Sequence, residues 1–259
     1  MKISHAYFFL LQCLLLLFAS ASASSSTTTA PSRYESIRAL DENGQSKQLQ
    51  HANQAALQHG TLILAVKHTN ETIHIISVTT TSPHRRQRPL AIVHTITPNT
   101  FLLCSGVQAD ARWLIDKLRE LHQQMQVRYG SSGAGWAQRL SSLYRAVFWG
   151  IPDEINQWQH TRGLELERWG RPLGVQSIII EHKQLCSLEP SGVIKLPDPH
   201  QQLAAIGKHS ADILLQWRSS SNSGSLVEQV RVACEGILPR GTVLSISQIG
   251  TDISWQMGL

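Results

Sequence analysis

The segment Cys104–His122, CSGVQADARWLIDKLRELH, places the end of an apolar strand, a Ser-Gly turn and a long helix directly after one another. Gly106 allows the sharp turn between the two elements. Asp110, near the helix start, is expected to favour the unpaired N–H groups and the positive end of the helix dipole. Apolar residues recur along this helix at spacings of three and four, namely at Ala111, Leu114, Ile115, Leu118 and Leu121. The segment therefore predicts a strand, a tight turn and an amphipathic helix.

The rest of the chain alternates between groups of strands and pairs of helices. Strands are expected at Thr61–Lys67 and, as its hairpin partner, at Thr72–Thr80. Further strands are expected on both sides of Pro98-Asn99, from Leu173, on both sides of the turn Glu189–Gly192, and last at Thr242–Ile249. Helices are expected at Lys47–His59, Ala109–Arg128, Ala134–Phe148, His209–Trp217 and Ser225–Leu238. Antiparallel hairpins dominate this order. It predicts an α+β fold with sheets packed face to face and helix layers outside.

The N-terminus has the order of a secretory signal peptide. Lys2 supplies a positive start, Tyr7–Phe18 is apolar except for one glutamine, and the following ASASAS offers cleavage after Ala21 or Ala23. The apolar run is shorter than the about 20 residues that span a bilayer comfortably. We therefore expect a signal peptide over residues 1–23 and a flexible tail over 24–33, with no membrane segment in the mature form. An uncleaved anchor or a wrongly assigned start codon are the alternatives.

The cysteines point to a different compartment. Cys104, Cys186 and Cys234 would remain after cleavage, an odd number, and each lies in an apolar context. This pattern indicates buried thiols and not a disulfide framework. Asn70-Glu71-Thr72 fits the glycosylation pattern, which is a common chance match. The sequence therefore leaves the compartment open.

Charge and composition favour no ligand-binding chemistry. The net charge of +5 is mild for 259 residues and does not by itself indicate nucleic-acid binding. The basic stretch His84–Arg88 is interpreted as a solvated loop. No histidine pair has the spacing of a zinc protease, and no serine has a partner order typical of a serine hydrolase. We expect no metal, no cofactor and no nucleic-acid partner.

Five strings, in order, resemble the proteasome core-particle family and specifically its α-type subunits. The resemblance covers Tyr34–Trp217, and the domain is expected to span residues 34–259. The strings are NGQSKQLQHANQAALQHGT (Asn43–Thr61), SGVQADARWLIDKLREL (Ser105–Leu121), RPLGVQSIII (Arg171–Ile180), LEPSGVI (Leu188–Ile194) and AAIGKHSADILLQW (Ala204–Trp217).

The resemblance implies the four-layer αββα sandwich of N-terminal-nucleophile hydrolases. It implies a divergent structural subunit that joins other α and β subunits in a hetero-oligomeric ring, with unfolded polypeptide as the substrate that passes through. The implied localisation is cytoplasm and nucleus. Ala109–Arg128 would form the surface towards the other ring, and Gln48–Gln58 the surface within the ring. The implied inter-subunit residues are Gln48, Gln50, Ala52, Gly106, Asp110, Ala111 and Arg112.

The gate motif of the α-type subunits, Tyr-Asp-Arg, is incomplete here. The sequence has Tyr34-Glu35-Ser36, so the arginine is missing. Tyr34 and Glu35 are the implied gate residues.

Catalysis in the active members uses a threonine freed by cleavage after a glycine, and Gly60-Thr61 offers that dipeptide. The mechanism also needs a carboxylate, whose position falls at Ser77 or Val78, and a lysine, whose position falls at Ile92. Neither position can activate Thr61, so we expect no catalytic residue and no enzymatic activity. An activator protein that docks through a carboxylate would need a charged partner at this position. A buried isoleucine, Ile92, cannot pair with a carboxylate, which argues against activator docking at this position.

Two alternatives remain open at this level. One is an active N-terminal-nucleophile hydrolase matured at Gly60, with Thr61 as its nucleophile. The other is a relative in the secretory pathway with a binding role, as the signal-like N-terminus indicates.

Overall fold

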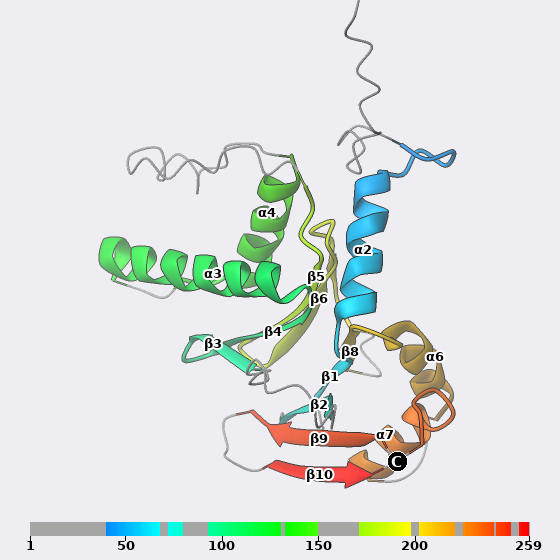
Figure 1. The fold of residues 1–259 in the computed structure, drawn as a ribbon. Coiled ribbons are helices and arrows are strands. Elements are labelled where there is room, and N and C mark those ends of the chain that lie inside the picture. The colour runs from blue at the N-terminus through cyan, green and yellow to red at the C-terminus, as the bar shows by residue number, and fades with distance from the viewer. Residues whose placement is uncertain are drawn as a thin grey trace, which may run out of the picture. The chain divides into compact units, whose positions relative to one another are not determined.

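A computed structural model describes residues 40–67, 72–79, 93–130, 133–149, 171–197, 202–220, 225–240, 242–249 and 254–258 (Figure 1). These residues belong to a compact unit that spans Ser36–Leu259. Several features predicted from the sequence lie outside the described residues: the signal peptide, the tail, Tyr34, Glu35, Asn70, the stretch 84–88 and Ile92.

The first sheet is built on the predicted hairpin. Strand β1 (Ile63–Lys67) pairs antiparallel with β2 (Ile73–Thr79), and Ile63 lies opposite Ser77. The strand order is β10-β9-β2-β1-β8. The remaining members are β8 (Leu203–Ile206), β9 (Val243–Gln248) and β10 (Ser254–Gly258).

The second sheet has the order β3-β4-β5-β6-β7. Strand β4 pairs with β5 along its whole length, from Thr100 opposite Glu181 to Gly106 opposite Val175. This pairing brings the Ser-Gly turn at the end of β4 beside the start of β5. The strands are β3 (Val93–Thr97), β4 (Thr100–Gly106), β5 (Val175–Glu181), β6 (Gln184–Leu188) and β7 (Ile194–Lys195).

The helices are α2 (Lys47–His59), α3 (Gln108–Tyr129), α4 (Trp136–Trp149), α6 (Ser210–Ser220) and α7 (Leu226–Cys234). Their ends follow local chemistry. Ser46 caps α2, because its hydroxyl accepts a hydrogen bond from the Leu49 N–H at 3.5 Å. The Glu181 carboxylate caps α4, accepting from the Gly135 and Trp136 N–H groups at 2.8 and 2.9 Å.

Three buried apolar clusters hold these elements together. The first joins α3 and α4 to the second sheet, the next lies between the two sheets, and the third joins the first sheet to α6 and α7. Leu114 of α3 and Ile179 of β5 are fully buried in the first cluster. Each such side chain contributes about 1.5–3 kcal/mol on burial, so the three clusters supply the main stabilisation of the fold.

Helix α2 lies outside this succession of layers (Figure 1). It packs on β4 and β5, with Ala52 and Ala56 buried. Because these alanines are small, the helix backbone comes close to the strands beneath it. Helix α2 is thereby fixed directly above the start of β1.

Several sequence-based predictions of the elements are corrected. A strand that was not predicted precedes helix α6, because Leu203–Ile206 pairs with β1 as an edge strand. The strand at Thr242–Ile249 is not the last, since β10 pairs with β9. Strand β1 begins at Ile63 and not at Thr61. Helix α7 ends at Cys234, where the Ile237 and Leu238 N–H groups turn back to the Cys234 carbonyl.

Candidate functional site

The segment around Thr61 is the meeting point of the motifs found in the sequence. The Ser105 hydroxyl, at the end of β4, donates a hydrogen bond to the Thr61 carbonyl at 2.6 Å. The Gly207 N–H, just after β8, donates to the Gln176 side chain of β5 at 2.8 Å. The end of α2, the starts of β1 and β5 and the ends of β4 and β8 therefore converge. We call Gly60, Thr61, Ser105, Gly106 and Gly207 the Thr61 junction.

Glycine is required at this junction because the backbones approach too closely for a side chain. A Cβ on Gly207 would lie 2.2 Å from the Thr61 carbonyl oxygen and 2.5 Å from the Ser105 hydroxyl, and its φ is +86°. A Cβ on Gly106, where φ is +136°, would lie 2.3 Å from the Gly174 carbonyl oxygen. Both glycines therefore satisfy a steric and a conformational demand together.

The described positions of β2 at which a threonine nucleophile would need a carboxylate do not hold one. Thr61 itself is exposed. Ser77, at one candidate carboxylate position, is buried and lies opposite Ile63, a member of the cluster between the sheets. Val78, at the other, packs with the cluster that contacts α6 and α7. Neither side chain is a carboxylate, and the position predicted for the lysine, Ile92, lies outside the described residues.

Asp110 holds the strand-to-helix turn in place through contacts that the sequence did not indicate. Its carboxylate forms a two-point ion pair with Arg171, at 2.7 Å and 3.0 Å, and accepts a hydrogen bond from the Gly174 N–H at 2.9 Å. Asp110 is the third residue of α3, and Val107 precedes the helix without a side-chain cap. The predicted use of Asp110 for the helix N–H groups is thus corrected: its oxygens bind the segment before β5.

The residues implied for subunit contacts divide into buried and exposed sets. Ala52, Asp110 and Ala111 are buried within the chain itself, and Gly106 is enclosed at the Thr61 junction. Gln48 is half-buried. Gln50 and Arg112 are exposed, so among these residues they are the ones whose side chains are open to a neighbour.

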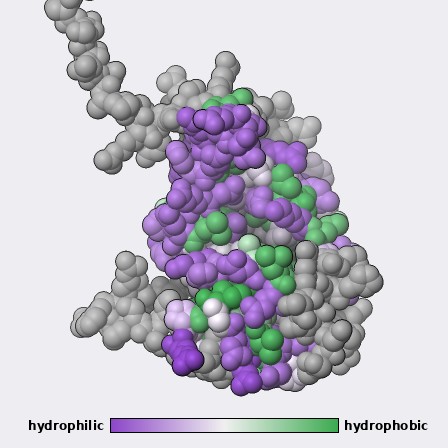
Figure 2. Space-filling view, turned by 90° about the vertical axis from the view of Figure 1, so that its right-hand side faces the viewer, coloured by the Kyte–Doolittle hydropathy of each residue, from purple (hydrophilic) through white to green (hydrophobic). Residues whose placement is uncertain are grey.

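The outward side of α2 is polar and almost uncharged. Its exposed residues are Gln50, His51, Gln54, Leu57, Gln58 and His59. Figure 2 shows the hydrophilic colour over this part of the molecule. A surface of amide side chains forms hydrogen bonds readily but carries little charge to steer a partner.

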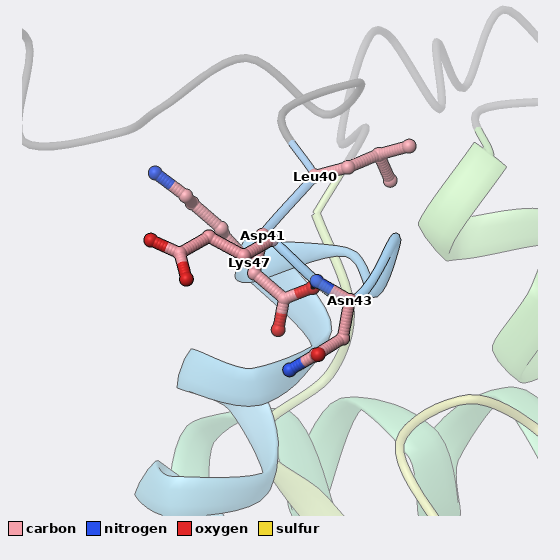
Figure 3. Close-up of a pocket in the computed structure, with 5 residues that line it drawn as sticks. Leu40, Asp41, Asn43 and Lys47 are labelled. Carbon is pink, nitrogen blue, oxygen red and sulfur yellow. The ribbon is translucent and has the colours of Figure 1, made fainter.

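A shallow pocket of about 380 Å³ lies at the N-terminal end of α2, lined by Leu40, Asp41, Glu42, Asn43 and Lys47 (Figure 3). Asp41 organises it, accepting hydrogen bonds from the Gln45 and Asn43 N–H groups and from the Gln50 side chain. The backbone N–H of Gln45, above all, lowers the pKa of Asp41. The loop is therefore ordered by its own hydrogen bonds.

The prediction of buried thiols holds for Cys234, whereas Cys104 and Cys186 are half-buried residues that pack against the first apolar cluster. Burial raises the pKa of Cys104 to about 12 and that of Cys234 to about 11, and it also raises the pKa of Cys186. Thiols that keep their protons are weak nucleophiles. Within the described ranges, no group of three or more His, Cys, Asp or Glu side chains is arranged to hold a metal ion.

Sequence reasoning found Gly106, Asp110 and Thr61 but missed Gln176 and Gly207. The string RPLGVQSIII contains Gln176, and AAIGKHS contains Gly207, yet nothing in either string reveals the contact between them. A glycine directly after a short apolar run was the available signal for a chain reversal.

No family model matches the chain, and no curated protein matches it in sequence. None of the described helices is both long enough and apolar enough to cross a membrane.

Proposed function

We propose that this chain is a divergent, non-catalytic α-type subunit of a proteasome core particle, with the four-layer αββα fold of that family. Its role is architectural: it joins related chains in a ring, supports the neighbouring ring of β subunits and restricts the entry of unfolded polypeptide. Its place of action in this proposal is the cytoplasm and nucleus, in protein breakdown.

The observation that carries this proposal is the integration of α2 into the fold. Ala56 is completely buried, and a Cβ on Gly60 would lie 2.2 Å from the Ala56 carbonyl oxygen and 2.5 Å from the Ser105 hydroxyl. Cleavage between Gly60 and Thr61 would separate a packed helix from the strand that follows it. A retained helix before the first strand is what an α-type subunit requires.

The packing supports the proposed fold. Helices α3 and α4 cover one sheet, α6 and α7 cover the other, and an apolar cluster joins the two sheets face to face. This agrees with the order of layers that the five sequence strings imply.

The side chains near Thr61 support the non-catalytic part. A threonine nucleophile needs a free amine and a group that takes or orients a proton. The positions of β2 that would hold the carboxylate have Ser77 and Val78 instead.

Purification of the tagged endogenous protein tests the proposal. We expect proteasome α and β subunits in the pull-down, identified by mass spectrometry, and a tagged chain that migrates with a large complex. A monomer without these subunits contradicts it. N-terminal sequencing separates the hydrolase alternative, because a mature chain that begins at Thr61 indicates an enzyme. A chain that begins after Ala23 and carries a glycan on Asn70 indicates the secretory alternative.

A further inference from the structure

The hydroxyl of Ser105 lies between two segments that are far apart in the sequence, the end of α2 and the start of α6. Ser105 is buried, with 3% of its surface exposed, and its hydroxyl donates to the Thr61 carbonyl at 2.6 Å. Helix α2 ends just before Gly60, and residues 207–209 lead from β8 into α6. In Figure 1 the last turn of α2 lies beside β1 and β8, and β8 continues into α6. The Ser105 hydroxyl is therefore placed to hold both segments.

The end of α2 packs closely on Ser105 and on the residue that follows it. A Cβ on Gly60 would lie 2.5 Å from the Ser105 hydroxyl oxygen. A Cβ on Gly106 would lie 3.2 Å from the Cα of Ala56, an α2 residue that is completely buried. Because close-packed groups transmit a displacement to each other, a movement of the last turn of α2 should shift the end of β4.

The turn before α6 contacts the same hydroxyl. A Cβ on Gly207 would lie 2.5 Å from the Ser105 hydroxyl oxygen. The Gly207 N–H donates to the Gln176 side chain at 2.8 Å, and the Gly207 carbonyl accepts from the Ser210 N–H at 3.2 Å. Since Ser210 is the first residue of α6, the helix begins on a residue whose position Ser105 and Gln176 fix.

The backbone of this turn needs support from its surroundings. His209 has φ +65°, in the left-handed region that residues with a Cβ disfavour, and Gly207 has φ +86°. A conformation of this kind persists where the surrounding contacts hold it. Weaker contacts at Gly207 should therefore free the turn, and with it the first turn of α6, whose Ile213 N–H donates to the His209 carbonyl at 3.1 Å.

We propose that the Ser105 hydroxyl couples the end of α2 to the start of α6, so that the two segments open together and a displacement of one is transmitted to the other. The start of α6 carries the exposed residues Lys208 and Asp212 beside the partly exposed His209. A contact that orders α2 would then also order this surface, because it removes an open state that the two segments share. The inference concerns the chain itself and holds whether or not the chain enters a ring.

Amide hydrogen exchange of the purified full chain tests the coupling. Ser105→Ala should raise the exchange rates both in the last turn of α2 and in residues 207–213. The expected rise is about fivefold, the effect of one ordinary hydrogen bond on an opening equilibrium. A rise confined to one of the two segments would overturn the inference, and circular dichroism confirms that the variant is folded.

A second variant perturbs the α6 end and leaves Ser105 in place. Gln176→Ala removes the hydrogen bond to the Gly207 N–H. If the segments are coupled, exchange should rise at the start of α6 and also, by a smaller factor, in the last turn of α2, since coupling between two sites is reciprocal. In the Ser105→Ala background, the added Gln176→Ala should no longer affect α2. Exchange in α2 that is the same in Gln176→Ala and in the wild type would overturn the inference.

Ser141→Ala is the matched control. Ser141 is also 3% exposed, and its hydroxyl also donates to a backbone carbonyl, that of Gly192, at 2.5 Å. This control should leave the exchange rates at the end of α2 and the start of α6 as they are in the wild type. If Ser141→Ala raised both as much as Ser105→Ala does, the effect would reflect the stability of the whole fold, and the coupling through Ser105 would be excluded.

Discussion

Asp110 and Arg171 join two distant parts of the chain through a two-point ion pair. The distances are 2.7 Å between Nη2 and Oδ1 and 3.0 Å between Nη1 and Oδ2. Asp110 is only 3% exposed, whereas Arg171 is 43% exposed. The pair fixes the first turn of α3 to the segment before β5, and so positions the Ser-Gly turn on which the Thr61 junction depends.

This difference in exposure predicts unequal effects of the two single substitutions. Arg171→Ala leaves a buried carboxylate with the Gly174 N–H as its remaining charge-stabilising contact, and should cost about 2–4 kcal/mol of the free energy of unfolding. Asp110→Asn keeps an acceptor oxygen and leaves an arginine that water can solvate, so about 1–2 kcal/mol is expected. Urea denaturation of the purified chain measures both. A larger loss for Asp110→Asn would contradict this assignment.

The close approach at Gly207 predicts a severe effect of a single methyl group. Gly207→Ala must strain a residue at φ +86° and also displace the Thr61 carbonyl, 2.2 Å from the new Cβ. Gly236→Ala is the matched control, since Gly236 has φ +80° with no atom within 4 Å of the new Cβ. The control should cost about 1–2 kcal/mol from backbone strain. Gly207→Ala should cost about 1–3 kcal/mol more than the control, because of the clash. Thermal denaturation measures both variants, and equal shifts of the midpoint would show that the Thr61 junction is not close-packed.

Burial of the Cys104 thiol predicts a loss of stability at alkaline pH. The pKa of Cys104 is raised from 9.0 to about 12 because the thiolate would be desolvated. As the pH rises above about 9, the unfolded chain loses this proton before the folded chain does, so the free energy of unfolding should fall. Between pH 9 and 10.5 the fall due to this group is about 1–2 kcal/mol. Denaturation midpoints of the wild type and of Cys104→Ala, measured across this pH range, test the prediction. If the midpoint of the variant falls with pH as steeply as that of the wild type, the effect belongs to other groups.

The lowered pKa of His94 predicts a loss of stability at acidic pH. Desolvation lowers the pKa of His94 below 6.5, and the nearby Arg119 lowers it further, against an opposing effect of Asp116. The unfolded chain therefore takes up the proton first as the pH falls below about 6.5, and the fold should lose stability from there down to the lower pKa of the folded state. His94→Gln should weaken this dependence. The thermal midpoints of the wild type and of His94→Gln, measured from pH 7.5 to 5, test this prediction. Equal slopes of midpoint against pH for the two proteins would exclude His94 as the cause.

The sequence predicted those elements whose signals are local. Helix α2 has the expected bounds, because Ser46 supplies a cap and Gly60 a stop signal. The β1–β2 hairpin and the strand pair around Pro98-Asn99 were also predicted correctly. Hydrophobic alternation and turn residues suffice where neighbouring segments of the chain pair with each other.

Features that depend on distant partners were not predictable in this way. Leu203–Ile206 is too short to show a period, and it becomes a strand because it pairs with β1. A carboxylate such as Asp110 suits the start of a helix whether or not an arginine lies near it. The ion pair with Arg171 could therefore not be inferred from the sequence, because the fold alone brings the two residues together. The contact between Gln176 and Gly207 likewise depends on the packing of one sheet on the other.

In the proposed function, this chain acts as an intact ring subunit with α2 still attached. Native mass spectrometry of the endogenous complex, followed by release of its subunits for intact-mass measurement, tests both parts in one experiment. We predict a complex of proteasome subunits that contains this chain with Gly60 and Thr61 still covalently joined. A free monomer, or a released chain whose mass begins at Thr61, would contradict the account.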